Sequence, residues 1–226
     1  MRRWVWVLAG VVVLLGGAAV VDTGVRLTTE NRIAAEVTAI PGLSTRPDVT
    51  IGGFPFLTQL ADGELDDVRL TAPSATVEGL LLEDVVVDLE GVRTEAPFTA
   101  VSATLTARTT PDAVERVLTV ALDLELRGDR LVTTTDVLGL PLDIVLEPRA
   151  AGRDVAVEVA GLMMAGIGVD ADQLPPDVAA MLTDLVVPLD GLPPGMVLTD
   201  VTVDDDGLHL RATGTGLDLT RAVAAP

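Results

Sequence analysis

From residue 48 onward the chain repeatedly alternates apolar and polar residues, a period of two that is typical of β-strands. Val85, Val87 and Leu89 fall on one face of such a strand, with acidic residues among their neighbours on the other. Similar alternation recurs at residues 101–108, 122–127, 140–146 and 155–159. Turn signals separate several of these runs, at Gly128-Asp129, Ala151-Gly152 and Asp206-Gly207. The intervals are too short for repeated crossover helices, so we expect an antiparallel meander with one apolar and one solvated face.

Three segments instead carry the apolar spacing of amphipathic helices. A leading helix over residues 22–40 ends at Pro41-Gly42. A second helix begins with Thr110 as N-cap and Pro111 in its first turn, and its apolar stripe is Val114, Val117, Leu118 and Ala121. A third runs from Pro175 to Pro188 with the stripe Val178, Met181, Leu182 and Leu185. We therefore predict an α+β fold, with a few helices packed on the apolar face of the sheet, and one domain over residues 22–226.

A separate apolar segment precedes this domain. Arg2 and Arg3 are followed by eighteen uncharged residues, 4–21, of which fifteen are apolar. This length and the flanking arginines predict an N-terminal hydrophobic helix, which acts either as an uncleaved signal anchor or as a cleaved signal peptide over residues 1–21. Both alternatives export the rest of the chain, and the first anchors it to the cytoplasmic membrane.

The composition excludes several classes of function. The 15 basic residues are all Arg, against 34 acidic residues, so the formal net charge is −19 and nucleic acid is not an expected partner. Without Lys or Cys, the chain has no Schiff-base lysine, disulfide or thiolate nucleophile. His209 is the single histidine. We predict no cofactor and no metal site.

The candidate catalytic groups are better explained as surface residues. His209 lies between Leu208 and Leu210 on a predicted strand, so its ring points away from the apolar face. The run Asp204 to Gly207 does not fit the twelve-residue calcium loop and is typical of a hairpin turn. Adjacent carboxylates such as Asp66 and Asp67 point to opposite faces of a strand and do not converge. We predict that the protein is not an enzyme.

The stretch from Ile51 to Leu60 is the least ordinary part of the chain. Gly52 and Gly53 precede Phe54-Pro55-Phe56, which holds two of the three phenylalanines. Two interpretations stay open: a strand corner plugged by hydrophobic side chains, or an aromatic mouth through which a lipid enters. The predicted core is otherwise aliphatic, and a groove lined by it suits an acyl chain, because each buried methylene contributes about 0.8 kcal/mol.

Two motifs resemble a known family. Residues 53–59, with Gly63-Glu64-Leu65 and Val68, are similar to the start of the actinobacterial LmeA-like family. Its C-terminal signature resembles residues 192–198, 201–203 and 206–208, and the similarity spans roughly residues 30–220. The resemblance implies a fold similar to tubular lipid-binding domains, in which a strongly curved antiparallel sheet wraps a long helix around an apolar channel. It also implies an envelope protein that faces the periplasm, binding of phosphatidylinositol-type lipid, a part in lipomannan elongation, and no established catalytic residue.

These observations predict non-catalytic binding or carriage of phospholipid or glycolipid in the cell envelope. The expected acyl-chain contacts are Phe54, Phe56, Leu57, Leu60, Val117 and Leu182. Arg69 or Arg93 is expected to meet a headgroup phosphate. Two alternatives stay open: an assembly module that holds another, unidentified envelope protein, and a carboxylate enzyme that acts on envelope glycolipid.

Overall fold

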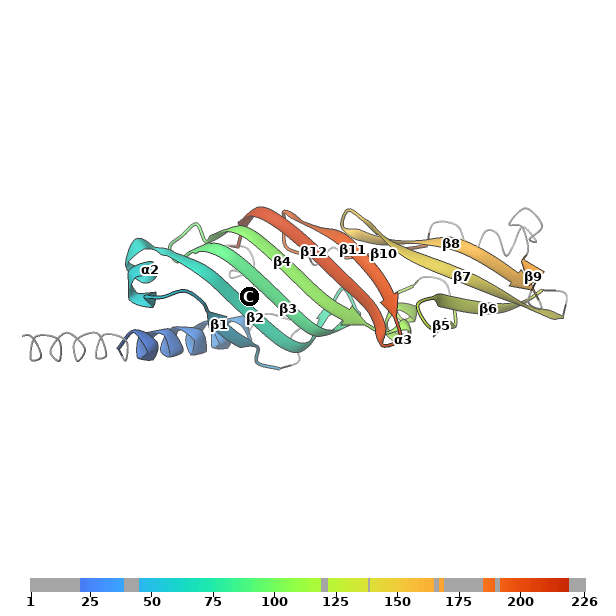
Figure 1. Ribbon diagram of the computed structural model, residues 1–226, viewed down its shortest axis with the longest axis horizontal. Helices are drawn as coiled ribbons and strands as arrows, with labels where there is room; N and C mark the ends of the chain where they lie inside the picture. Colours follow the sequence, from blue (N-terminus) through green and yellow to red (C-terminus); the bar gives the residue numbers. More distant parts are fainter. Residues whose placement is uncertain are drawn as a thin grey trace, which may run out of the picture.

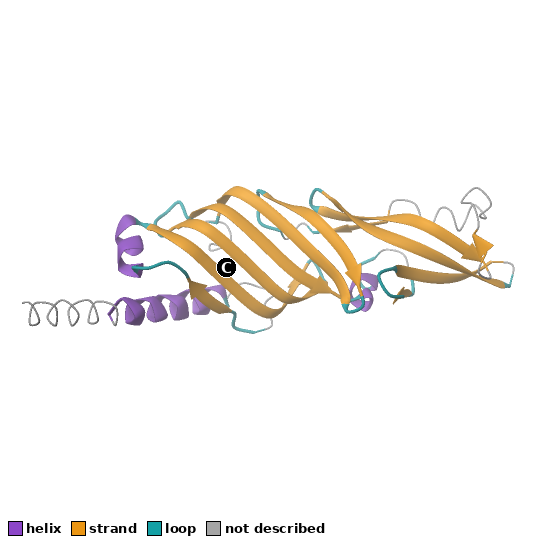
Figure 2. Ribbon diagram, in the orientation of Figure 1, coloured by secondary structure: helices purple, strands orange, loops and turns teal. Residues whose placement is uncertain are grey.

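The computed structural model describes residues 21–38, 45–118, 122–137, 139–164, 167–168, 185–189 and 192–219. Within these ranges the protein is mostly β-strand, arranged as two sheets that follow one another along the long axis of the molecule (Figures 1 and 2). All strand pairs described are antiparallel, as the alternation predicts.

The first sheet, which we call the long sheet, contains the longest strands. Its spatial order is β1 (Asp48–Ile51), β2 (Glu64–Val77), β3 (Leu80–Arg93), β4 (Thr99–Thr109), β12 (Gly207–Asp218) and β11 (Met196–Asp204). The chain leaves this sheet after β4 and returns to it only with β11.

The second sheet, which we call the inserted sheet, is built from the residues between β4 and β11. Its order is β10 (Leu185–Pro188), β8 (Asp154–Met164), β7 (Leu140–Ala151), β6 (Leu131–Val137) and β5 (Leu124–Leu126), with β9 (Ile167–Gly168) paired to β8. Its presence corrects the expected single meander, because alternation in a sequence fixes which residues share a face and not which strands are neighbours.

The strong curvature expected of one wrapping sheet is also wrong, because both sheets are open and neither curls strongly (Figure 2). A physical reason lies in how the apolar face of the long sheet is covered. The leading helix packs on only one end of that sheet, through Val25, Ile33 and Ala34. At the far edge of the long sheet, β11 packs against β7 and β8 of the inserted sheet, so the two sheets share a core without either one wrapping around a helix.

Three helices are present among the described residues. Residues 21–37 are helical, which confirms most of the leading helix predicted over residues 22–40. The helix α2 (Phe56–Asp62) follows the glycine pair. The helix α3 (Pro111–Glu115) begins as predicted, with Thr110 as its N-cap, and is shorter than predicted.

The third predicted helix is wrong at its C-terminal end. Residues 185–188 form strand β10, in which Val187 is buried and lies opposite Val155 of β8. Two consecutive β-branched residues, Val186 and Val187, favour a strand, and Leu185 fits the helical stripe by spacing alone. The rest of this predicted helix, including Leu182, lies outside the described residues.

A β-bulge in β3 explains why even-numbered residues at the start of the strand and odd-numbered residues after it face the same interior. Leu80 and Leu82 are buried, and so is Val85, three positions further along. The pairing of β3 with β4 shifts between Glu83 and Val86, where Asp84 has a φ of 51°. The extra residue moves the inward face from even to odd positions.

Two separate apolar cores result. The junction core lies between the two sheets and α3, and takes buried residues such as Leu80, Leu131 and Leu210 from both. The end core lies beneath the leading helix and α2, and contains Ala34, Val49, Ile51, Phe56, Leu65 and Val68. The limits of the predicted domain stay a prediction.

No helix among the described residues combines the length and the apolarity needed to cross a membrane. Residues 1–20, which hold nearly all of the predicted hydrophobic helix, lie outside the described ranges.

Candidate functional site

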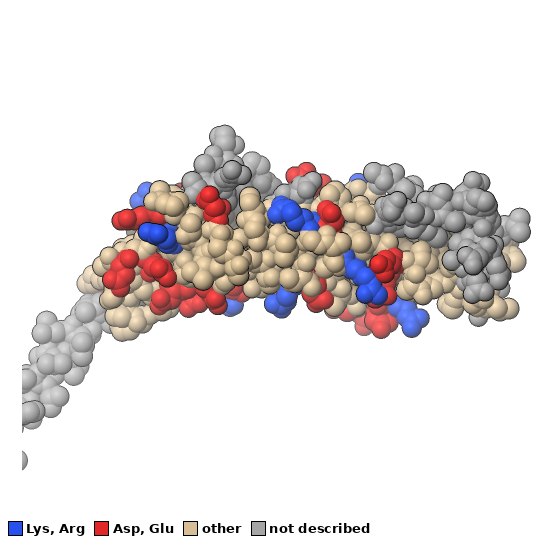
Figure 3. Space-filling view, turned by 90° about the horizontal axis from the view of Figure 1, so that it is seen from above, with Lys and Arg blue, Asp and Glu red and all other residues tan. Residues whose placement is uncertain are grey.

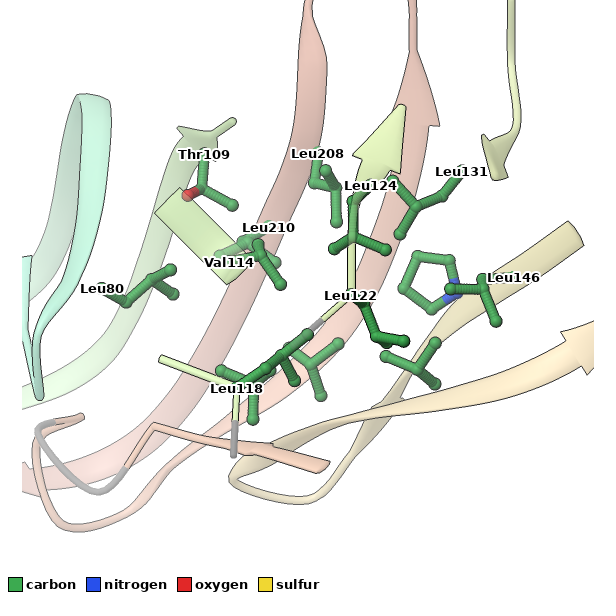
Figure 4. A pocket seen from close by; sticks show the side chains of 14 residues that line it. Leu80, Thr109, Val114, Leu118, Leu122, Leu124, Leu131, Leu146, Leu208 and Leu210 are labelled. Carbon is green, nitrogen blue, oxygen red and sulfur yellow. The ribbon is translucent and has the colours of Figure 1, made fainter. Parts of the chain in front are cut away.

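The junction core surrounds a small apolar cavity between the two sheets (Figure 4). Its lining is aliphatic apart from a single hydroxyl group, and comes from the long sheet, from α3 with the residues after it, and from the inserted sheet. The lining residues are Leu80, Thr109, Val114, Leu118, Leu122, Leu124, Leu131, Leu146, Pro148, Val155, Val157, Val187, Leu208 and Leu210.

The one polar side chain of this lining is already satisfied. Thr109 is buried, and its hydroxyl donates a hydrogen bond of 2.8 Å to the carbonyl oxygen of Leu81. Its methyl group is therefore what it can offer to the cavity. A site with no spare hydrogen-bonding group selects for an apolar ligand, because a polar ligand would lose its bonds to water without replacement.

The helix α3 covers one side of this cavity. Thr110 accepts a hydrogen bond from the amide of Ala113 at 3.3 Å, and Pro111 in the first turn needs no amide partner. At the other end, a carboxylate oxygen of Glu115 accepts a hydrogen bond from the backbone amide of Leu124, the first residue of β5. Between these ties, Val114 is buried against the junction core.

The cavity is small in this conformation. Its volume is about 20 Å³, which is room for roughly one water molecule and not for an acyl chain. The groove expected along the apolar face of the sheet is therefore closed among the described residues. An acyl chain can enter only if the two sheets or α3 separate and the lining side chains repack.

Polar contacts at the edge of the junction core hold the two sheets together. The guanidinium group of Arg153, in the turn between β7 and β8, donates hydrogen bonds to the carbonyl oxygens of Leu192, Pro193 and Met196. The amide of Leu198 in β11 donates to the carbonyl oxygen of Gly152 at 2.7 Å. The Leu-Pro-Pro-Gly segment, residues 192–195, is thus a docking segment for the inserted sheet.

The phenylalanine-rich motif lies in a different place, at the end core. Phe56 is completely buried there, whereas Phe54 is 73% exposed. Leu57 and Leu60 on α2 are 38% and 40% exposed. Phe56 is therefore a plug of the end core, which agrees with the strand-corner interpretation, while the role of this motif in lipid contact stays a prediction. Phe54, Leu57 and Leu60 face outward.

Local hydrogen bonds explain the rest of this motif. The Gln59 side chain is buried, donates to the carbonyl oxygen of Gly52 at 3.2 Å and accepts from the amide of Asp66 at 2.9 Å. Gly53 has a φ of 79°, and a Cβ atom there would lie 2.3 Å from the Gln59 amide nitrogen. A side chain at position 53 is therefore excluded on two grounds.

Val117 is the one described acyl-chain candidate that packs against the junction core. It is partly buried and lies between two lining residues of the chain, Val114 and Leu118. Leu182 lies outside the described residues. The predicted cluster of six contacts thus divides, among the described residues, between two cores at different places in the fold.

The two predicted headgroup ligands lie on the surface. Arg69 on β2 forms an ion pair with Asp88 on β3, and hydrogen bonding to Asp88 raises its pKa. Arg93 at the end of β3 lines a shallow depression together with Asp62, Glu64 and Glu95. Carboxylates around an arginine disfavour a phosphate by like-charge repulsion. Both predictions stay untested.

The hairpin of β11 and β12 groups Asp204, Asp206 and His209. The Nε2 atom of His209 lies 2.9 Å from a carboxylate oxygen of each aspartate. Hydrogen bonding to Asp206, with a further contribution from Asp204, raises the pKa of His209. The outward position of His209 and the hairpin turn are as predicted. These three side chains are the described group with the donors to hold a metal ion.

Most of the cavity lining was not among the predicted site residues. Leu146 and Leu208 lie on predicted inward faces, whereas Leu80 and Leu131 lie outside the predicted alternating runs. Alternation along a strand predicts which residues are buried, but it does not show which faces of the two sheets pack together.

Comparison with known proteins gives one family. The family model described as LmeA-like phospholipid-binding matches residues 20–213. No curated protein and no solved structure matches the chain.

Proposed function

Because this chain belongs to the LmeA-like phospholipid-binding family, we propose that it binds phospholipid without catalysis and holds the acyl chains in the junction core. The observation that supports this site is the aliphatic lining of its cavity, in which the single hydroxyl group is already bonded. Each methylene of an acyl chain transferred there contributes about 0.8 kcal/mol.

Binding in this proposal requires the junction core to open. The residues that meet across the cavity are mainly leucines and valines. An acyl chain between them would replace their apolar contacts with one another by similar apolar contacts with its methylenes. The helix α3 is the element best suited to move, because it has only five residues. Its movement would break the hydrogen bond from the amide of Leu124 to Glu115, while the Thr110 cap would keep its first turn intact. The contacts of Arg153 keep the two sheets attached at the edge while the interior widens.

The proposed lipid is of the phosphatidylinositol type, and the proposed place of action is the periplasmic side of the cell envelope. The first rests on the resemblance to the LmeA-like family, and the second on the apolar residues 4–21 after two arginines. A part in lipomannan elongation is proposed on the same resemblance. Headgroup analysis of the bound lipid and fractionation of cells that produce the full chain test these points.

The central experiment is extraction of lipid from the purified full chain, followed by mass spectrometry. We expect phospholipid in a fixed ratio to protein after exchange through detergent and gel filtration. Protein that stays free of lipid after incubation with phosphatidylinositol vesicles would count decisively against the proposed function.

A matched pair of variants locates the site. Leu118→Trp places a bulky indole ring beside the cavity, whereas Leu70→Trp makes the same change at another half-buried leucine, beside the end core. We expect the first variant to lower the lipid-to-protein ratio severalfold and the second to leave it unchanged. Both changes carry a similar packing cost, of about 1–3 kcal/mol, so a comparison of thermal unfolding separates lost binding from lost folding. An equal effect of the two variants would remove the junction core as the site.

A further inference from the structure

The outer face of α2 is an exposed apolar surface in a part of the chain that carries no charge. Residues 49–61 contain no acidic or basic residue, although 22% of the whole chain is charged. Within this stretch, Phe54, Leu57 and Leu60 are all exposed, Phe54 by 73%. Leu57 and Leu60 are three positions apart, so they are neighbours on one face of the helix. We call these three side chains the α2 surface.

The burial of the opposite face fixes this orientation. Phe56 and Gln59 point inward, where Phe56 fills the end core and Gln59 bonds to backbone atoms on both sides. Rotation of α2 to hide its leucines would expose Phe56 and break both bonds of Gln59. The apolar surface is therefore a stable feature of the fold and not a helix caught between two positions.

The leading helix begins at the same end of the molecule as α2 (Figure 1). The buried carboxylate of Asp22 accepts hydrogen bonds from the amides of Phe56 at 3.1 Å and Leu57 at 2.7 Å. Val21, the preceding residue, is exposed. The eighteen uncharged residues 4–21 therefore connect to the domain directly beside the α2 surface.

We propose that the α2 surface contacts the lipid bilayer, with Phe54, Leu57 and Leu60 inserted at the level of the headgroups. An apolar segment of bilayer-spanning length and an exposed apolar helix face share one end of the protein, and a bilayer accommodates both. Exposed apolar surface of this kind marks an interaction site. This bilayer contact is separate from the junction core and does not depend on what that core binds.

The charge of the protein determines how this contact operates. The formal net charge is −19, and on the face shown in Figure 3 acidic side chains lie interspersed with arginines. Anionic headgroups would repel such a protein, so the contact relies on apolar insertion. It should form on zwitterionic vesicles and should not weaken when salt is raised.

The absence of cysteine from the chain allows a direct test. Single cysteines at Leu57→Cys, Leu60→Cys and Ile167→Cys, each carrying an environment-sensitive fluorophore, are introduced into the full chain, which is then reconstituted in phosphatidylcholine vesicles. Ile167 is the control, since it is 71% exposed on β9, at the opposite end of the molecule from α2 (Figure 1). Spin-labelled phosphatidylcholine then reports how close each fluorophore lies to the bilayer.

We expect quenching at positions 57 and 60 to exceed that at position 167 by at least about threefold, because an interfacial helix buries its apolar face about 5–10 Å into the boundary between headgroups and acyl chains. Equal quenching at the three positions would overturn the proposal, as would failure of the full chain to float with vesicles. A blue shift at position 57 without lipid quenching would also overturn it and would assign the surface to a second copy of this chain. Quenching is read independently of any lipid that co-purifies in the junction core, so this proposal and the proposed function can fail separately.

Discussion

The two apolar cores are built from the same alternating strands and differ in how polar groups fasten them. In the end core, side chains of Asp22, Glu30 and Gln59 reach across elements and bond to backbone groups around Phe56. In the junction core, the facing residues are aliphatic, and the fastening groups lie at the edge, with Arg153 and Glu115. The hydrogen bonds inside the end core fix the relative positions of the elements around it. In the junction core, the side-chain bonds described between the two sheets lie at the edge, so its interior can widen without breaking them.

The largest expected effect distinguishes the plug of the end core from its exposed neighbour. Phe56→Ala removes a fully buried ring and should lower the free energy of unfolding by about 3–5 kcal/mol. Phe54→Ala alters an exposed side chain and should change it by less than about 0.5 kcal/mol. Chemical denaturation measures both. A similar loss in the free energy of unfolding for the two variants would mean that the buried ring of Phe56 does not stabilise the end core.

The next effect tests whether the edge holds the junction core together. Arg153→Ala removes the donor to three carbonyl oxygens and should cost about 2–3 kcal/mol in the free energy of unfolding. Arg149→Ala, which breaks exposed ion pairs on the neighbouring strand, should cost less than about 1 kcal/mol. Hydrogen exchange should also show faster opening of β10 and β11 in the first variant. No difference between the two would disprove the role of Arg153 as an edge fastener.

A smaller effect examines the polar ties inside the end core. Asp22→Ala deprives the amides of Phe56 and Leu57 of their acceptor, and should cost about 1–2 kcal/mol, comparable to the loss of an N-cap. Asp22→Asn keeps one acceptor oxygen, so its loss should be intermediate. Thermal unfolding of the three proteins should follow that order, and an asparagine variant as stable as the wild type would show that one bond is enough.

The smallest expected change in stability concerns the surface cluster of Asp204, Asp206 and His209, whose side chains hold neither core together. The pKa of His209 is raised in the folded state, so its pairing with Asp206 and Asp204 stabilises the fold fully below the unfolded value of about 6.5. This contribution is lost as pH rises through the folded pKa. His209→Gln should therefore be less stable than the wild type by under about 1 kcal/mol at pH 5, and equal to it at pH 9. A pH-independent difference would contradict the ion pair.

Much of the fold follows from the sequence, because alternation and capping are local. The inward face of Val85 and Val87, the Thr110 cap and the outward ring of His209 are all as predicted. The bulge at Asp84 and the insertion of a second sheet are not local, since they depend on which strands meet. The surroundings of the candidate site follow from the sequence only in part: helical spacing places Val117 against the junction core, whereas Leu131 and Leu146 are brought to the cavity by the pairing of β6 with β7. The predicted site residues themselves stay predictions.

The position of β12 has a consequence for the order of folding. This strand lies between β4 and β11, with Leu208 opposite Thr109, so an inner strand of the long sheet is synthesised only after the whole inserted sheet. Until it arrives, β4 has an open edge, and the whole inserted sheet separates it from its partner. Long-range pairings of this kind form slowly. The newly made chain must therefore keep β4 soluble with one edge unpaired until β12 is available, and a deletion of β12 divides the long sheet in two.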